Sequence, residues 1–218
     1  MFGDGVLTND ESQAVFIYSC EWVPRELSLY NIVNGLLRDK DRSKALPFLP
    51  YIKLLCTALS KVLSFFQEYA AARVKNSNQS GCFLPSLRNA LLTTANCKLQ
   101  QILRPTTGIL WRGVALDLEA VYLPKLGKTI VFWGFTSTTS DMAALDAFIP
   151  PDSPQRTLFS ITTGLAADLA PYSAFPGEGE LLIPAGHVFE VVNVKRFSRS
   201  APRPWRDATR SERRRRDP

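Results

Sequence analysis

The chain has 218 residues, 45% of them hydrophobic, so we expect one globular domain with a sizeable core. The formal net charge of +6 comes from the end of the chain, because residues 195–218 hold ten basic and three acidic residues and leave the remainder at −1. A body so close to neutral argues against a basic nucleic-acid-binding protein.

Four cysteines could form two disulfides in a secreted protein, but the sequence favours free thiols. No C-x-x-C pair occurs, and Cys56 lies in an apolar helical pattern where a buried free thiol is common. The first eleven residues lack the basic segment and apolar core of a secretory signal, and Lys53 and Lys61 interrupt the most apolar run. We therefore expect an intracellular, cytoplasmic protein with no membrane span.

The first half of the chain predicts helices. After a short apolar run at 13–18, Pro24 opens a helix in which apolar residues recur every three or four positions as far as Leu37. A polar break at 39–43 precedes a second amphipathic helix that runs to about residue 72. The polar stretch 74–82 predicts a flexible loop, and a third helix is expected over 87–102, before a proline.

The pattern changes from Gly108 onward to short apolar runs separated by proline, glycine and aspartate. Strands are predicted at 108–114, 129–136, 157–163, 180–183 and 188–196, with short helices at 116–122 and 141–147. Helices first and strands later favour an α+β fold over a doubly wound parallel sheet.

One stretch, F-P-G-E-G-E-L-L-I-P-A-G-H-V-F-E-V at 175–191, combines a chain break with two glutamates. In an extended backbone alternate side chains point to the same face, so we expect Glu178 and Glu180 to lie about 7 Å apart at the start of a strand. Two carboxylates this close repel unless a cation lies between them. The alternative is a hairpin with two solvated carboxylates.

The single histidine, His187, excludes Ser-His-Asp triads and H-E-x-x-H zinc sites, and the cysteine spacings do not suggest a metal. No G-x-G-x-x-G motif is present, so a Rossmann turn would not hold a dinucleotide. Two carboxylates can still cleave an N-glycosidic bond, because an anion stabilises the oxocarbenium ion that forms.

Three short motifs, which contain an arginine, a serine and two glutamates, follow one another along the chain: L-W-R-G-V at 110–114, G-F-T-S-T-T at 134–139 and P-G-E-G-E at 176–180. Together they resemble the R-S-E group of mono-ADP-ribosyltransferases, and the last motif is close to the arginine-specific branch. The L-Y-N-x-x-x-x-L-L-R wording from Leu29 is similar to the N-terminal lobe of the eukaryotic enzymes. The resemblance covers about 14–196. It implies a helical lobe at about 24–104 and a mainly antiparallel two-sheet core at about 108–196, with 74–97 as an insertion.

The resemblance also implies roles for the two glutamates. Glu180 matches the catalytic glutamate, which binds the 2′-hydroxyl of the nicotinamide ribose and stabilises the cation. Glu178 matches the acceptor-selecting position, where a carboxylate pairs with a guanidinium. Glutamine at this position is typical of branches that modify other residues, so arginine is the expected acceptor.

Four further residues match the binding site of the family. Arg112 matches the arginine that clamps the phosphates and ribose of NAD, and Gly113 would let the backbone approach the nicotinamide amide. Ser137 would orient the catalytic glutamate, and Phe135 would lie near the nicotinamide ring. A salt bridge for Arg112 and a core position for Phe135 are the structural alternatives.

The expected function is therefore transfer of ADP-ribose from NAD, used as co-substrate without a metal, to arginine side chains of a protein partner. An NAD glycohydrolase and a catalytically silent binding module are the alternatives. Loop aromatics Tyr172 and Phe175 are candidates for recognising the protein substrate. Residues 197–218 predict a basic disordered tail, which is either solvated or attracts an acidic partner.

Overall fold

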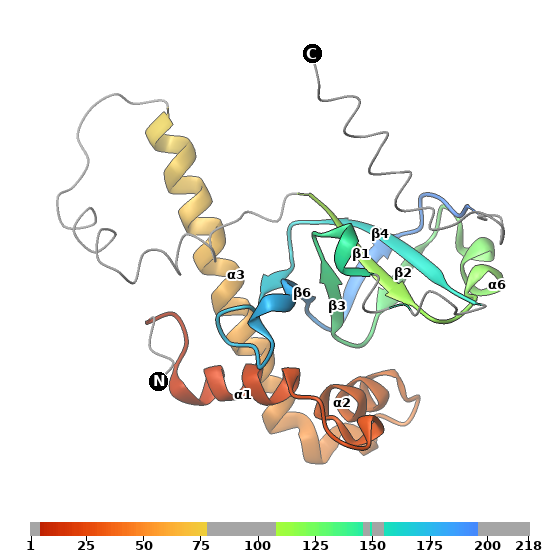
Figure 1. Cartoon of the computed structure of the whole chain (residues 1–218), viewed down its shortest axis with the longest axis horizontal. Coiled ribbons are helices and arrows are strands. Elements are labelled where there is room, and N and C mark those ends of the chain that lie inside the picture. Colours follow the sequence, from red (N-terminus) through yellow and green to blue (C-terminus); the bar gives the residue numbers. More distant parts are fainter. Residues whose placement is uncertain (1–4, 78–107, 146–148, 150–154, 196–218) are drawn as a thin grey trace.

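The computed structural model describes residues 5–77, 108–145, 149 and 155–195, and Figure 1 shows a helical part packed beside a strand-rich part. The predicted third helix at 87–102, most of the loop predicted at 74–82 and the basic tail at 197–218 lie outside the described residues.

The first helix, α1 (Asn9–Ser19), is longer than the short apolar run that the sequence predicted. A capping box starts it: the Thr8 hydroxyl accepts from the backbone N–H of Glu11, and the Glu11 carboxylate accepts from the N–H of Thr8. Glu11 also forms an ion pair with Lys61 at 2.6 Å, which links α1 to the longest helix.

The helix predicted from Pro24 is two elements, η1 (Arg25–Leu27) and α2 (Leu29–Arg38). Ser28 has extended backbone between them, and its hydroxyl accepts a hydrogen bond from the N–H of Trp22 at 2.9 Å. The recurring apolar residues of this stretch differ in burial, since Leu27 is 52% exposed whereas Val33 is fully buried.

The polar break at 39–43 is confirmed and leads into η2 (Arg42–Phe48) and then α3 (Leu49–Ser77). The loop predicted from residue 74 is wrong in its first four residues, because α3 continues to Ser77. No proline or glycine interrupts residues 51–77, so nothing in the local sequence ends the helix earlier.

The stretch Arg42–Phe65 is long and apolar enough to cross a membrane by length and composition alone. Three of its residues, Leu55, Leu59 and Val62, form the core with α1 and the sheet. A core helix passes the same test, so this feature is weak support for a membrane span.

The strand-rich part contains two antiparallel sheets, which confirms the predicted α+β, two-sheet fold. The larger has the order β4-β1-β3-β6-β5 and the smaller pairs β2 with β7. The strands are β1 (Gly108–Val114), β2 (Thr129–Phe132), β3 (Thr136–Thr139), β4 (Thr157–Thr163), β5 (Ala167–Asp168), β6 (Glu180–Ile183) and β7 (His187–Glu190).

Several strand predictions need correction. The strand predicted at 129–136 ends at Phe132, since Thr136 already begins β3 of the other sheet, and the last strand ends at Glu190. β6 and β7 belong to different sheets, so the stretch at 175–191 is not a hairpin. The helix predicted at 116–122 is the shorter α6 (Glu119–Tyr122), and η3 (Leu123–Lys125) follows it. Within the described part of 141–147, η4 (Met142–Ala144) is helical as predicted, and residues 146–147 lie outside the described residues.

The strand β6 is buried on both faces, which decides where its first residue points. Leu182 belongs to the cluster shared with α1 and α3, while Leu181 and Ile183 pack with the aromatic residues between the two sheets. Side chains alternate along a strand, so Glu180 lies on the same face as Leu182. The first residue of β6 therefore faces the helical part.

Candidate active site

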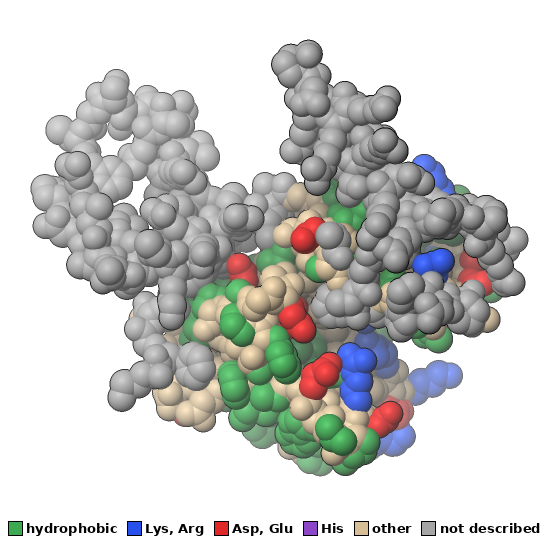
Figure 2. Space-filling view, viewed as in Figure 1, with side chains coloured by type: hydrophobic (Ala, Val, Ile, Leu, Met, Phe, Trp, Pro, Cys, Tyr) green, Lys and Arg blue, Asp and Glu red, His purple; other side chains and the backbone are tan. Residues whose placement is uncertain are grey.

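A cleft of about 260 Å³ lies between the helical part and the larger sheet. It is lined from α1 to α2 by Tyr18, Ser19, Glu21, Arg25, Tyr30, Asn31, Asn34 and Arg38, and from the strands and the loop before β6 by Arg112, Gly113, Phe135, Ser137, Phe175, Glu178 and Glu180. All six residues expected at the site from sequence thus lie in one cleft. Figure 2 shows acidic and basic side chains close together on one face of the molecule, beside apolar ones.

Arg112 lies in β1, where it is half-buried, and its Nη1 donates a hydrogen bond to the backbone carbonyl of Ser137 at 2.8 Å. β1 and β3 pair at one position only, between Trp111 and Thr139. Beside that position the Arg112 side chain bonds to the backbone of β3, where hydrogen bonds between the two backbones would otherwise form. Burial lowers the pKa of Arg112, and the nearby cation of Arg38 lowers it further.

Glu180 begins β6, which pairs with the strand of Ser137, and both residues line the cleft. Burial raises the pKa of Glu180 above the usual glutamate value. The Ser137 side chain opposes this rise, the Glu178 carboxylate adds to it, and the positive charge of Arg112 opposes it.

The predicted backbone between the two glutamates is wrong. Glu178 ends the short helix η5 (Pro176–Glu178), and Gly179 follows with φ of 57°, in the left-handed region that favours glycine. Glu178 is exposed, so it does not share the strand and its burial with Glu180. This turn separates an exposed carboxylate at the mouth of the cleft from a more buried one inside.

Packing requires glycine at position 113, which the sequence analysis did not predict. A Cβ atom here would lie 2.2 Å from Cδ1 and 2.4 Å from Cγ1 of Ile149, so only glycine fits beside this fully buried side chain. The approach of its backbone to a nicotinamide amide stays a prediction.

Phe135 is 1% exposed and packs edge-on against Tyr18, with ring centroids 5.5 Å apart. It forms the floor of the cleft as part of the core, and contact with a nicotinamide ring stays a prediction. Tyr172 is 3% exposed, so its predicted role in substrate recognition is wrong. Phe175 is 42% exposed and lines the cleft.

None of the eight cleft residues from the helical part had a predicted role, and Tyr18, Asn34 and Arg38 are three of them. The Nδ2 of Asn34 donates to the Tyr18 hydroxyl at 3.0 Å, while its buried Oδ1 has no hydrogen-bond partner among the described residues. A Cβ on Gly134 would lie 2.8 Å from that Oδ1 and 3.2 Å from Nη2 of Arg38. The L-Y-N-x-x-x-x-L-L-R wording ends at Arg38 but leaves Asn34 at an unspecified position, so only their four-residue spacing in the sequence could have placed both on one side of α2.

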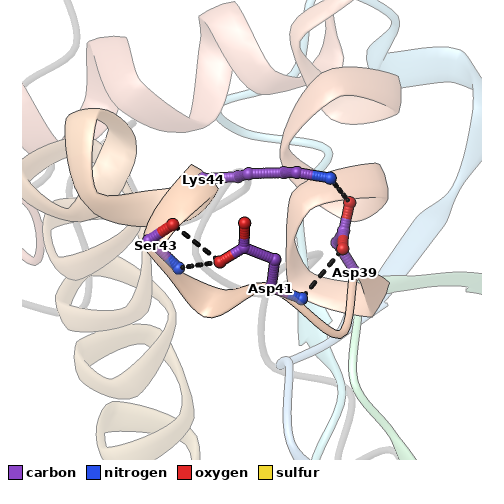
Figure 3. Close-up of polar contacts among 4 residues, drawn as sticks. All are labelled: Asp39, Asp41, Ser43 and Lys44. Atoms are coloured by element: carbon purple, nitrogen blue, oxygen red, sulfur yellow. Dashed lines mark hydrogen bonds and ion pairs between the residues drawn. The ribbon is translucent and has the colours of Figure 1, made fainter.

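The turn after Arg38 is held by its own side chains (Figure 3). Lys44 forms an ion pair with Asp39 at 2.7 Å, and the Asp41 carboxylate accepts from both the backbone N–H and the hydroxyl of Ser43. The Lys44 hydrogen bond is the main reason that the pKa of Asp39 is lowered. These contacts fix the end of α2 and so the direction in which Arg38 enters the cleft.

Two cations, Arg38 and Arg112, thus lie near one another in a cleft that also contains Glu180. Such a pair of guanidinium groups suits a diphosphate, which would relieve their repulsion. Within the described ranges, no group of three or more His, Cys, Asp or Glu side chains is placed to hold a metal ion.

A helical layer against a two-sheet antiparallel core, with an arginine, a serine and a glutamate from three strands in one cleft, defines the class of ADP-ribosyltransferase folds. A family model described as NAD:arginine ADP-ribosyltransferase matches residues 5–202, so the chain belongs to that family.

Among curated proteins, the chain is 38% identical over 72 residues to the NAD(P)(+)–arginine ADP-ribosyltransferase 1 of Gallus gallus, covering 33% of this chain and 22% of that protein. It is 36% identical over 75 residues to the GPI-linked NAD(P)(+)–arginine ADP-ribosyltransferase 1 of Homo sapiens, covering 34% and 21%. The match thus spans about a fifth of the length of these curated relatives.

Solved structures support the fold at low identity. The ADP-ribosyltransferase Vis, from Vibrio splendidus, was solved in complex with agmatine; it has a TM-score of 0.55 and 22% identity over 89% of this chain and 72% of that one. HopU1 of Pseudomonas syringae pv. tomato has a TM-score of 0.56 and 22% identity over 86% and 71%.

Proposed function

We propose that the protein is a mono-ADP-ribosyltransferase that moves ADP-ribose from NAD to arginine side chains of proteins and releases nicotinamide. The observation that carries this proposal is the connected set of Arg112, Ser137 and Glu180. Three different strands supply these residues, which line one cleft, and Arg112 donates a hydrogen bond to the backbone carbonyl of Ser137. Such agreement would be unexpected for three unrelated structural residues.

The guanidinium groups of Arg38 and Arg112 bind the diphosphate of NAD in this proposal, because a planar fork of donors matches phosphate oxygens. Glu180, ionised and oriented by Ser137, stabilises the positive charge that develops on the ribose as nicotinamide leaves. The leaving group is already cationic, so no general acid is required.

Arginine as the acceptor is supported by the exposed carboxylate of Glu178 at the mouth of the same cleft, which suits pairing with a guanidinium. Further support comes from Vis, which shares the fold and was solved with agmatine, a small molecule that carries a guanidinium. The curated relatives are also named for arginine.

The test is incubation of the full chain with NAD labelled in its adenosine part, with agmatine as acceptor and cadaverine as a matched amine that lacks a guanidinium. We expect label on agmatine, none on cadaverine, and release of free nicotinamide. Nicotinamide release without labelled agmatine would replace the proposal with NAD hydrolysis. No release with either acceptor would favour a catalytically silent binding module.

A further inference from the structure

The segment between α1 and η1 carries two exposed apolar side chains beside the opening of the cleft. Glu21 and Arg25 line the cleft, and between them Trp22 is 45% exposed and Val23 is 99% exposed. A single exposed apolar residue needs no explanation, but these two are consecutive and lie next to the candidate site. They therefore mark a surface for contact with another molecule.

The loop before β6 adds a third exposed apolar side chain to the same opening. Phe175 is 42% exposed and lines the cleft. The N–H of Ala174 donates to the hydroxyl of Ser19 at 2.8 Å, so this loop lies against the end of α1, three residues before Trp22. Trp22, Val23 and Phe175 thus belong to one side of the opening, which we call the apolar rim.

Hydrogen bonds fix the shape of the rim segment that carries Trp22. Its N–H donates to the hydroxyl of Ser28, a fully buried residue. The Arg25 side chain pairs with Glu21 at 3.1 Å, and the Arg25 carbonyl accepts from Nδ2 of Asn31 at 2.8 Å. A surface that is ordered in advance loses little conformational entropy when a partner binds, so this segment is preorganised for contact.

The carboxylate that suits an acceptor arginine stands beside the apolar rim. Glu178 is exposed and lines the cleft three residues after Phe175. Neighbouring residues of an extended chain are only about 3.3 Å apart, so the residues next to an arginine that pairs with Glu178 lie over the rim. Apolar neighbours gain contact with Trp22 and Val23 there, whereas polar neighbours lose hydration without a hydrogen-bond partner.

We propose that Trp22 and Val23 are specificity-determining residues, which select acceptor proteins whose target arginine is flanked by apolar side chains. This inference rests on the proposed function of the cleft and narrows the class of acceptor. The contact is made by the residues around the arginine and not by its guanidinium. A small guanidinium compound such as agmatine therefore reacts without using this surface.

The experiment compares two short peptides that differ only beside one central arginine, with leucine at both flanking positions in the first and serine in the second. The full chain is supplied with saturating labelled NAD, and kcat/KM for label transfer is measured with each peptide. We expect the leucine peptide to be preferred at least about tenfold, the size expected for burial of an aliphatic side chain. A preference below about threefold would overturn the inference.

Val23→Ser and Trp22→Ser test whether the apolar rim carries this preference. Each variant should reduce it at least about threefold through a lower kcat/KM for the leucine peptide, and the double variant should remove it. The matched control is Val192→Ser, because Val192 is 79% exposed, follows β7 and lies outside the cleft lining. A preference that persists in the double variant would overturn the inference.

Agmatine separates this inference from the proposed function. Val23→Ser should label agmatine at the wild-type rate, and an equal fall with agmatine and the leucine peptide would overturn the role in specificity. Dimerisation of the wild type that Val23→Ser abolishes in sedimentation would assign the rim to a second copy and also overturn it. Wild type that labels agmatine without peptide preference would leave only the proposed function. Absence of label on agmatine and both peptides would overturn both.

Discussion

Replacing Glu180 with glutamine tests the charge of the carboxylate and changes little else. The substitution conserves the size of the side chain, so the strand and the cleft should stay intact. What is lost is one negative charge near the ribose cation. Opposite charges about 4 Å apart attract by about 4 kcal/mol at an effective dielectric constant of about 20.

A loss of about 3 kcal/mol remains if the glutamine dipole recovers part of that attraction, which corresponds to a fall in kcat of about 10²-fold or more. Nicotinamide release and agmatine labelling should fall together, because the cation forms whichever nucleophile arrives. Glu190→Gln, an exposed carboxylate on β7, is the matched control and should keep the wild-type rate. A decrease smaller than about threefold for Glu180→Gln would refute the proposed role.

The same carboxylate predicts a pH dependence. Burial raises the pKa of Glu180, so the wild-type rate should fall with decreasing pH at a higher pH than for an ordinary glutamate. The residual rate of Glu180→Gln should not show this step. A wild-type rate that is flat well below the usual glutamate pKa, with NAD saturating, would contradict a required carboxylate.

The stability of the folded protein should depend on pH in the opposite direction to the rate: it should decrease as pH rises. The folded-state pKa of Glu180 lies above the unfolded value, so the folded protein binds this proton more tightly, and stability is lost as pH rises through that interval. Glu180→Gln should therefore unfold at a higher temperature than the wild type at neutral pH. The difference should vanish below about pH 3, where both forms carry a neutral side chain. A lower melting temperature for the variant at neutral pH would contradict the sign.

Three further substitutions test other parts of the site. Glu178→Gln should abolish transfer to agmatine and spare much of the NAD hydrolysis, which simultaneous assay of both products would detect; equal loss of both products would contradict an acceptor-binding role. Arg38→Gln should raise KM for NAD at least about tenfold, because a charged hydrogen bond to phosphate is lost, and an unchanged KM would remove it from the binding site. Gly113→Ala should lower stability by about 1–3 kcal/mol in denaturant unfolding because its Cβ would overlap Ile149, whereas Gly108→Ala, which meets no atom within 4 Å, should not.

Local sequence was sufficient for much of the sheet. The strands at 108–114, 157–163 and 180–183 were predicted with the bounds that the structure has, because apolar runs bounded by proline, glycine and aspartate are a local signal. The site residues were named from the resemblance of the three short motifs to a known family. Those motifs lie on β1, β3 and at the start of β6, where the backbone fixes the position of a side chain within a narrow range.

Tertiary structure decided how these pieces meet. The sequence does not show that the strand from Thr129 ends at Phe132 and that a strand of the other sheet begins at Thr136, or that β5, with only two residues, pairs with β6. Strand pairing is a contact between distant segments, and a two-residue strand has no periodicity to detect. The relation of Glu178 to Glu180 also depended on a left-handed Gly179, which interrupts the extended backbone assumed from their spacing.

The helical side of the cleft is the part of the site that local sequence predicts least well. Asn34 and Arg38 look like ordinary polar positions on an amphipathic helix, and local pattern alone would assign them to solvent. Their position in the cleft arises because the backbone of Gly134, one hundred residues after Asn34, packs against them. Burial of a polar side chain is a property of the packed molecule, so the sequence by itself determined the residue types available on α2, and only packing decided which of them face the cleft.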